Sequence, residues 1–347
     1  MRSLNLVLVL AVQGIAAVGV SAAGKADSQD GQAQRRPPVV ALSCSPDSRQ
    51  ILAAGQFGVE IYDVAAGQGD AEQSAVTELR QPVHRLDVEM PNVHSIAFSP
   101  DGKLLAIGGG APSDGGIVEL YSWPDLERRV QVQPHQDIVY GMAWSPDGKY
   151  LATVSYDRDV KILDATDGGE VRKLSGHSRP VLSVAWLSDG ETLLTAGVDR
   201  SLRVWQTSSG KLSRSLENHT QTIHALAVRP QQDETARPMI ATAGADKSIR
   251  FWQPTIGRMV RFARLESAPL GLAWTADGGL AIAACEDGKL RGINPDTASV
   301  EFSVDVSNAR LQSLAIAGGE GSSKEMAYAG DANGRLFRVR LTGSEDD

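Results

Sequence analysis

Residues 176–210 have the sequence GHSRPVLSVAWLSDGETLLTAGVDRSLRVWQTSSG, and the rest of the chain repeats the pattern of this stretch. It opens with a Gly-His pair, and its first apolar run ends at the turn Ser188-Asp189-Gly190. Gly accepts positive φ and Asp can hydrogen-bond its own backbone, so this turn separates two strands. The β-rich runs between turn signals predict four short strands, over residues 181–186, 192–197, 202–205 and 211–216.

The same pattern recurs along the chain between Val39 and Leu341. Segments similar to the first strand occur at residues 39–47, 93–101, 138–147, 181–189, 223–230, 270–277 and 311–319. Segments similar to the third strand keep step with them, at residues 59–63, 118–122, 160–164, 202–206, 249–253, 290–294 and 336–340. Seven matches in register, at intervals of roughly 40 to 55 residues, indicate seven copies of one supersecondary unit.

Four strands in about forty residues, opened by Gly-His and closed near Trp205, resemble a WD40 repeat, which forms one blade of a β-propeller. The resemblance implies an all-β, seven-bladed WD40 β-propeller over residues 37–341, with each blade a four-stranded antiparallel sheet. The repeats also resemble those of exported bacterial WD40 proteins, some of which are joined to c-type cytochrome domains. Since the chain has no CxxCH motif, a haem partner would be a separate chain, and no cofactor is predicted.

Composition and charge agree with a globular, turn-rich chain. Hydrophobic residues make up 42% and charged residues 22% of the sequence, with 35 Gly and 16 Pro. The net charge is −8 and no basic stripe is evident, so nucleic acid is not a predicted partner. The two cysteines, Cys44 and Cys285, fall in the first and sixth repeats, which are not neighbours. We therefore predict two packed thiols rather than a disulfide.

The N-terminus predicts export. Arg2 precedes an apolar run over residues 4–20, and the small residues that follow predict a signal peptide over residues 1–22, cleaved after Ala22 or Ala23. The alternative is an uncleaved N-terminal helix that anchors the chain, because about twenty apolar residues can span a bilayer. The expected location is periplasmic or extracellular, without stable membrane insertion after cleavage. The remaining segments are a flexible leader at residues 23–36, the propeller at residues 37–341 and an acidic tail at residues 342–347.

Two insertions lengthen the repeats. Residues 67–83 extend the outer part of the first repeat, and residues 108–116 (GGGAPSDGG) predict a surface loop in the second. After the third strand of the last repeat only residues 342–347 remain, and they are too polar to form an outer strand. Because an open sheet edge invites pairing with other chains, we predict that residues 30–40 supply the missing strand and close the ring.

Polar residues recur at repeat spacing and resemble the buried brace of WD40 blades, in which a His, a Ser or Thr, an Asp and a Trp form one hydrogen-bonded chain. Carried over to this sequence, the structural brace consists of His177, Thr195, Asp199 and Trp205 in the fourth repeat and His219, Thr242, Asp246 and Trp252 in the fifth. The third repeat offers His135, Thr153 and Asp157, with Ser155 as an alternative hydroxyl and Leu163 in place of the Trp. A catalytic triad uses the same residue types, but a nucleophile has no reason to recur in adjacent repeats.

One position of each first strand is expected at the mouth of the central channel. These channel-mouth positions are Val40, His94, Tyr140, Leu182, His224, Gly271 and Gln312. The resemblance implies that protein or peptide partners dock there, with Tyr156 and Arg179 on the same face. The predicted partner-binding residues are His94, Tyr140, Tyr156, Arg179, Leu182, His224 and Gln312. The alternative is that these groups merely line a water-filled channel.

The chemistry of these positions defines the expected function. Two histidines on separate blades without a carboxylate make a poor metal site, so no metal is predicted. Partly exposed histidines would titrate at about pH 6.5 and make binding pH-sensitive. No catalytic residue is predicted, and we expect a non-enzymatic exported scaffold that presents a propeller face to a protein partner. The alternative is an enzyme or a ligand sensor that uses the channel mouth, since a fold alone does not define a function.

Overall fold

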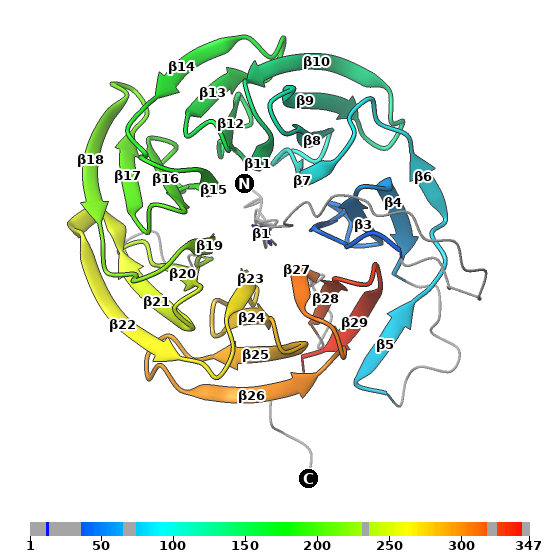
Figure 1. Ribbon diagram of the computed structural model, residues 1–347, viewed down its shortest axis with the longest axis vertical. Coiled ribbons are helices and arrows are strands. Elements are labelled where there is room, and N and C mark those ends of the chain that lie inside the picture. Colours follow the sequence, from blue (N-terminus) through cyan, green and yellow to red (C-terminus); the bar gives the residue numbers. More distant parts are fainter. Residues whose placement is uncertain (1–11, 14–35, 65–73, 231–235, 318–324, 342–347) are drawn as a thin grey trace, which may run out of the picture.

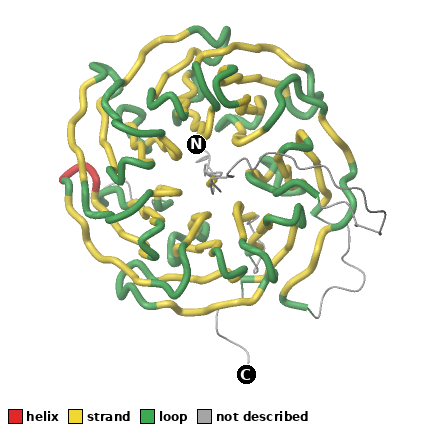
Figure 2. Tube along the Cα trace, in the orientation of Figure 1, coloured by secondary structure: helices red, strands yellow, loops and turns green. Residues whose placement is uncertain are grey.

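The computed structural model describes residues 12–13, 36–64, 74–230, 236–317 and 325–341, which form a seven-bladed β-propeller (Figure 1). The blades are antiparallel sheets arranged radially around one axis, with the first strand of each blade innermost. Among the described residues the single helical element is η1 (Pro254–Ile256), a 3-10 turn drawn in red in Figure 2. The predicted fold class is confirmed.

The strands of each blade follow one another from the axis outward. Blades 1 and 2 contain β2 (Ala41–Cys44), β3 (Gln50–Gly55), β4 (Gly58–Asp63) and β6 (His84–Leu86), then β7 (Val93–Phe98), β8 (Leu104–Ala111), β9 (Gly115–Ser122) and β10 (Arg128–His135). Blades 3 and 4 contain β11 (Val139–Trp144), β12 (Tyr150–Ser155), β13 (Val160–Asp164) and β14 (Glu170–Leu174), then β15 (Val181–Trp186), β16 (Thr192–Gly197), β17 (Leu202–Gln206) and β18 (Lys211–Leu216).

The second half of the ring has the same order. Blades 5 and 6 contain β19 (Ile223–Val228), β20 (Ile240–Gly244), β21 (Ser248–Gln253) and β22 (Arg258–Arg264), then β23 (Pro269–Trp274), β24 (Ala281–Cys285), β25 (Lys289–Ile293) and β26 (Val300–Asp305). Blade 7 contains β27 (Leu311–Ala317), β28 (Met326–Asp331), β29 (Leu336–Arg340) and β5 (Val76–Leu79). β1 (Val12–Gln13), which falls within the predicted signal peptide, pairs with β27.

Local sequence defines the turn between the first and second strands. In blade 3, Ser145 Oγ donates to Asp147 Oδ1 at 2.7 Å, and the same oxygen accepts the N–H of Lys149 at 3.1 Å. Gly148 adopts φ +72°, which Gly accepts without strain. The same hydroxyl–carboxylate bond occurs in Ser45–Asp47, Ser99–Asp101 and Thr275–Asp277.

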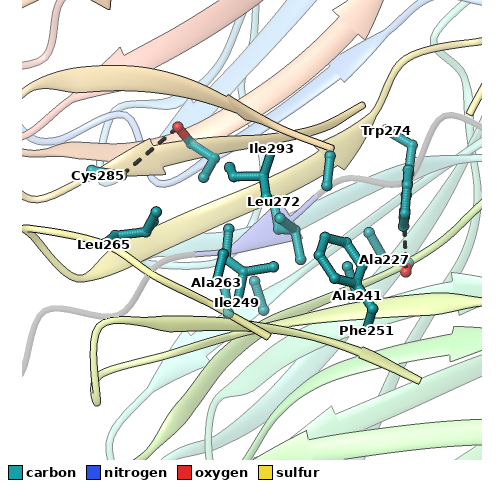
Figure 3. Packing of buried hydrophobic residues seen from close by; sticks show 14 residues of the cluster. Ala227, Ala241, Ile249, Phe251, Ala263, Leu265, Leu272, Trp274, Cys285 and Ile293 are labelled. Atoms are coloured by element: carbon teal, nitrogen blue, oxygen red, sulfur yellow. Dashed lines mark hydrogen bonds between the residues drawn. The ribbon is translucent and has the colours of Figure 1, made fainter. Parts of the chain in front are cut away.

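The hydrophobic core lies between neighbouring blades. Figure 3 shows one such cluster between blades 5 and 6, where the ring centroids of Phe251 and Trp274 lie 5.8 Å apart. Trp274 Nε1 donates to the carbonyl of Ala227 in the preceding blade at 3.1 Å. Equivalent bonds run from Trp144 to Ala97 and from Trp186 to Ala143. Each blade therefore completes its core only against its neighbours.

An internal segment closes the ring. β5 pairs antiparallel with β29 as the outer strand of blade 7, with Leu79 opposite Leu336 and Val76 opposite Val339. The chain then returns to blade 1, where β6 pairs with β4 as the outer strand. The insertion at residues 67–83 thus supplies the outer strand of blade 7, and the residues that follow it supply the outer strand of blade 1.

The prediction that residues 30–40 form the closing strand is wrong. Residues 30–35 lie outside the described residues, and residues 36–40 form no strand, although the N–H of Val39 donates to the Asp331 carbonyl at 3.1 Å. Two adjacent prolines at residues 37–38 lack the N–H groups that a ladder requires. Residues 76–79 (VTEL) carry these donors and therefore take the outer position.

The glycine-rich segment of blade 2 extends a hairpin and is not the predicted surface loop. β8 runs to Ala111 and β9 begins at Gly115, so only residues 112–114 form the turn. A Cβ on Gly109 would collide with the carbonyl oxygen of Asn92, which explains why glycine is needed there. The same carbonyl accepts the N–H of Gly110 at 3.0 Å, and this bond ties the hairpin to the loop before β7.

The two cysteines are free and buried, as predicted. Burial raises the pKa of Cys44 to about 12 and that of Cys285 to about 11, so both thiols stay protonated at neutral pH. They lie in non-adjacent blades 1 and 6, which explains why they do not pair.

Within the described part of the chain, no helix has the length and apolar character needed to cross a bilayer. The predicted leader at residues 23–36 and the tail at residues 342–347 lie outside the described residues, apart from Arg36. Cleavage after Ala22 or Ala23 stays a prediction.

Candidate partner-binding site at the channel mouth

In six blades the innermost strand skips one residue in its pairing with the second strand. In blade 3, Val139 and Gly141 pair with β12 but Tyr140 does not. Such a β-bulge bends the strand and changes the direction of the extra side chain. Val40, just before β2, holds the same place in blade 1. We call these seven residues the inner ring: Val40, His94, Tyr140, Leu182, His224, Leu270 and Gln312.

The inner ring matches the predicted channel-mouth positions except in blade 6. There Leu270 takes the place assigned to Gly271, because β23 begins at Pro269, one residue before the apolar pattern suggests. An added Cβ on Gly271 would lie 3.2 Å from Leu314 of blade 7, so this position faces the neighbouring blade. Gly141 likewise faces Leu182 of blade 4.

Contacts between blades show that several of these side chains converge. The rings of His94 and Tyr140 meet edge to face with centroids 5.1 Å apart. Tyr140 and Leu182 belong to one apolar cluster with Ile138. The ring of Tyr156 lies 6.1 Å from that of Tyr140. Residues from blades 2, 3 and 4 therefore form one mixed apolar and polar surface, in which Tyr140 and Leu182 are buried and Tyr156 is exposed.

Burial changes the electrostatics expected of this surface. It lowers the pKa of His94 to about 4, and burial together with the nearby His219 lowers the pKa of His224 to about 4. The expectation that these histidines titrate at about pH 6.5 is therefore wrong. Burial also raises the pKa of Tyr140 to about 12. All three groups are neutral at pH 7.

Two polar atoms of the inner ring, His224 Nδ1 and Gln312 Oε1, are buried without a hydrogen-bond partner in the described part of the chain. Buried polar groups are usually paired, since an unpaired one carries a desolvation cost. Both atoms lie on innermost strands near the axis of the ring, where β1 lies among these strands and pairs with β27 (Figure 1).

Exposed side chains surround this surface on the turns of blades 3, 4 and 5. Because β12 runs antiparallel to β11, the turn that follows Ser155 lies beside Val139 and its neighbour Tyr140. Tyr156 is 51% exposed on this turn, and Arg179 is exposed before β15. The exposed cations, which we call the basic rim, are Arg158, Arg179, Arg200 and Lys247, and none forms an ion pair with a described residue.

Three members of the basic rim are not among the binding residues predicted from the sequence. Arg158, Arg200 and Lys247 occupy equivalent tight turns with φ of +76°, +68° and +60°. The detectable signal was an Asp-Arg or Asp-Lys pair at the same point of three successive repeats. In each pair the Asp is hydrogen-bonded to the His of its brace, and the cation that follows the Asp is exposed at the surface.

The brace residues form the hydrogen-bonded chain that the resemblance implied. In blade 4, Trp205 Nε1 donates to Thr195 Oγ1 at 2.8 Å, Thr195 Oγ1 lies 2.7 Å from His177 Nε2, and His177 Nδ1 lies 2.8 Å from Asp199. Blade 5 repeats these bonds with Trp252, Thr242, His219 and Asp246. Blade 3 joins Thr153, His135 and Asp157 in the same way, without a Trp.

The protonation states agree with this chain of bonds. Burial lowers the pKa of His177, although Asp199 opposes the shift. Burial would raise the pKa of Asp199, but the hydrogen bond and charge of His177 lower it to about 2. A neutral His177 can donate from Nδ1 to the carboxylate and accept from the hydroxyl at Nε2. Thr195 is fully buried and receives the Trp205 N–H, so its hydroxyl is held inside the blade.

Blades 1 and 2 use a different brace. In blade 2, Tyr121 donates from its hydroxyl to Glu119 at 2.8 Å, and Arg128 donates to the same carboxylate at 3.2 Å. Glu60, Tyr62 and Arg85 form the equivalent set in blade 1. Blades 6 and 7 instead pair Asp287 with Arg291 and Asp331 with Arg335.

Comparison with known proteins places this architecture in a family. The model of the WD domain, G-beta repeat, matches residues 80–122, 127–164, 168–206 and 210–253. These matches end at the third strands of blades 2 to 5. The protein is thus a seven-bladed β-propeller with WD40 repeats. Through these repeats the chain belongs to the WD40 repeat family.

Three relatives illustrate the similarity. The chromatin assembly factor 1 subunit FAS2 homolog of Oryza sativa subsp. japonica is 30% identical over 148 residues, covering 40% of this chain and 28% of that protein. WD repeat-containing protein VIP3 of Arabidopsis thaliana is 28% identical, covering 28% of this chain and 33% of that protein. The transcriptional corepressor LEUNIG_HOMOLOG of Arabidopsis thaliana is 38% identical, covering 24% and 10%.

This chain therefore spans between a tenth and a third of the length of these curated relatives. All three are eukaryotic, so they give no support to the expected resemblance to exported bacterial WD40 proteins. In the described residues, no group of three or more His, Cys, Asp or Glu is arranged to hold a metal ion.

Proposed function

We propose that this protein is a non-enzymatic, exported scaffold that binds a protein partner at the inner ring and the basic rim. The observation that carries the proposal is the convergence of His94, Tyr140 and Leu182 from three blades, beside the exposed Tyr156. Tyrosine gives a large, rigid contact surface with a polar tip, and such residues act as anchors in protein interfaces. WD40 propellers mediate protein–protein interactions as scaffolds, which agrees with this role.

The basic rim indicates the chemistry of the partner. Four cations without described ion-pair partners lie on exposed turns of blades 3 to 5, equivalent to or beside the turn that carries Tyr156, whereas the chain as a whole carries a net charge of −8. Complementary charge would orient an acidic segment toward this face and repel basic ones. An acidic segment that also carries an apolar or aromatic side chain fits both the rim and the inner ring.

The non-enzymatic part of the proposal rests on the brace. Its hydroxyl, imidazole and carboxylate groups bond one another inside the blades, and the set recurs in blades 3, 4 and 5. Such recurrence fits a structural element better than a catalytic one.

Export rests on the sequence of residues 1–22. Terminal sequencing of the protein from its native source is expected to begin at Ala23 or Gly24, after the small residues that signal peptidase prefers. A mature chain that still begins at Met1, recovered with membranes, would support the anchored alternative instead.

The binding site is tested with a partner captured from the exported fraction and identified by mass spectrometry. Its affinity is then measured for the double variant Tyr140→Ala, His224→Ala, which removes an anchor and a polar group from the inner ring. Because truncation of an interface anchor costs about 2 kcal/mol or more, we expect Kd to rise at least about 30-fold.

The matched control is Arg49→Ala, Lys103→Ala, two exposed side chains on turns after the first strands of blades 1 and 2. It should bind the partner like the wild type. Wild-type affinity of the Tyr140, His224 variant, with normal thermal stability, would place the binding site elsewhere.

A further inference from the structure

The outer strands of blades 4 and 5 carry a second concentration of positive charge. Arg258, Arg261 and Arg264 are all exposed on β22, and Lys211 and Arg214 are exposed on β18. None of the five forms an ion pair with a described residue. We call these five residues the basic flank.

The two strands are neighbours on the circumference of the ring (Figure 1). Arg214 Nε donates to the carbonyl of Thr255, in the turn that leads into β22, at 3.2 Å. Lys211 and Arg258 hold equivalent positions, since each pairs with the last residue of its third strand. The basic flank is therefore one continuous sector, formed by β18, η1 and β22.

Exposed apolar side chains lie in the same sector. Leu212 on β18 is 42% exposed, Ile256 in η1 is 43% exposed and Phe262 on β22 is 50% exposed. These are three of the seven large hydrophobic side chains that are exposed in the described part of the chain. Single exposed apolar residues need no explanation, but three among five cations define a surface that is both basic and apolar.

Protection of a sheet edge does not account for this composition. Charged residues on an outer strand can prevent unwanted pairing, and the other blades use them in ion pairs. Arg128 on β10 pairs with Glu89 and Glu119, and Lys289 on β25 pairs with Asp305 on β26. The basic flank differs because its cations have no such partners among the described residues.

We infer that the basic flank docks this protein peripherally on an anionic lipid surface. Cations close to an anionic leaflet gain favourable electrostatic energy, while partly inserted apolar side chains gain from leaving water. Net charge of −8 makes most other orientations repulsive, so the flank would approach first. This inference goes beyond the proposed function, because docking on the circumference leaves the inner ring and the basic rim free for a protein partner.

The experiment is co-sedimentation of the full chain with vesicles of phosphatidylcholine alone, or of equal parts phosphatidylcholine and phosphatidylglycerol. We expect selective binding to the anionic vesicles, which weakens as salt is added. The charge-reversal variant Arg258→Glu, Arg261→Glu, Arg264→Glu should bind on the order of 100-fold more weakly, since each cation near the surface contributes favourably. The variant Leu212→Ser, Phe262→Ser should also bind more weakly at high salt.

The matched control is Arg49→Glu, Lys103→Glu, Lys149→Glu, which makes the same change in net charge on exposed turns of blades 1 to 3. It should keep most of the vesicle binding. Three results would overturn the inference. They are an equal loss of vesicle binding in the two triple variants, equal binding of the wild type to neutral and anionic vesicles, and no sedimentation of the wild type with either kind of vesicle.

Two further measurements distinguish lipid docking from loss of the fold and from binding of a soluble acidic protein. Partner affinity of the Arg258, Arg261, Arg264 variant should equal that of the wild type, which shows that the fold is intact. The Tyr140→Ala, His224→Ala variant should bind vesicles normally, so failure of the proposed function leaves this test unaffected. Competition by a soluble acidic protein at low concentration, with no salt-resistant vesicle binding, would indicate a protein ligand and overturn the lipid assignment.

Discussion

At the scale of single residues, an aromatic side chain on the third strand of blades 1, 2, 4 and 5 distinguishes two ways of satisfying buried polar groups. Where Trp205 or Trp252 occupies the position, the indole donates to a Thr and completes a chain with His and Asp. Where Tyr62 or Tyr121 occupies it, the phenol donates to a Glu two residues earlier. Both solutions bury an aromatic ring and leave its polar atom paired.

The Trp brace leads to a stability prediction. Trp205→Phe keeps most of the apolar bulk but removes the N–H that Thr195 accepts. Loss of this buried bond should lower the free energy of unfolding by about 1–3 kcal/mol, because a buried group left unpaired is costly. Urea denaturation measures the change, and partner affinity should stay at the wild-type value. Weaker partner binding at unchanged stability would show that Trp205 belongs to a binding site.

The buried histidines predict acid sensitivity. His94 and His224 have a folded pKa of about 4, below the value of 6.5 that they have in the unfolded chain. Between these values the unfolded chain binds more protons, so the free energy of unfolding falls as the pH falls. Each histidine contributes at most about 1.4 kcal/mol per pH unit over this window. Urea denaturation at several pH values between about 7 and 4.5 measures the slope.

The control for this prediction is the double variant His94→Asn, His224→Asn, which should show a shallower slope. A remaining slope is expected from His177 and His219, whose pKa values are also lowered by burial. The same slope in the wild type and the double variant would contradict a neutral, buried state of His94 and His224.

At the scale of secondary-structure elements, two features allow seven similar sheets to form a closed ring. They are the β-bulges of the innermost strands and the outer strand β5, which comes from the first repeat but pairs in blade 7. Each bulge adds one residue to the innermost strand, and the extra residue joins the inner ring while its successor packs between blades. Gly141 and Gly271 follow this rule because a larger residue there would meet the next blade. β5 adapts the outer end, since it completes blade 7 from a segment that belongs by sequence to blade 1.

The closing strand predicts a local weakness. Leu79 of β5 is buried in a cluster with Leu336, Tyr328 and Val39. Leu79→Ala should lower stability by about 2–5 kcal/mol, since truncation of a buried Leu leaves a cavity. Hydrogen exchange should accelerate first in β29, which pairs with β5. Leu212→Ala on the exposed face of β18 is the control and should change little; equal effects of the two variants would contradict the role of β5.

At the scale of the whole molecule, charge is distributed unevenly over a rigid ring. The chain carries a net charge of −8, yet the basic rim and the basic flank each gather cations without described ion-pair partners. Because every core cluster spans two blades, the ring holds these surfaces in fixed relative positions. The rim lies on one face and the flank on the circumference, so the two surfaces can act independently.

This distribution predicts how the partner associates. The association rate constant should fall by about tenfold or more between low and physiological salt, because salt screens the attraction between the basic rim and an acidic segment. Stopped-flow or surface-binding kinetics measure this dependence. The variant Arg158→Glu, Arg179→Glu should lose most of it, while Tyr140→Ala should mainly raise the dissociation rate. A salt-independent association rate would argue against an acidic partner.

The number of blades, the first and third strands of each blade and the composition of the Trp brace could be predicted from local sequence. Turn residues, apolar runs and brace residues recur at a fixed spacing, and such local signals can be recognised without knowledge of long-range pairing. The positions of six inner-ring residues were also predictable, because each follows the first apolar residue of its strand. The seventh was misplaced in blade 6, where Pro269 begins the strand and shifts the position to Leu270.

The closure of the ring, the burial of groups at the channel mouth and the clustering of positive charge depend on contacts between distant parts of the chain, so they could not be predicted from local sequence. Pairing of β5 with β29 joins residues 76–79 to residues 336–339, and no local signal specifies a contact over such a distance. The lowered pKa values of His94 and His224 depend on burial in the folded protein, which a repeat pattern does not reveal. The basic flank arises because β18 and β22, separated in the chain by β19, β20 and β21, lie side by side on the outside of the ring.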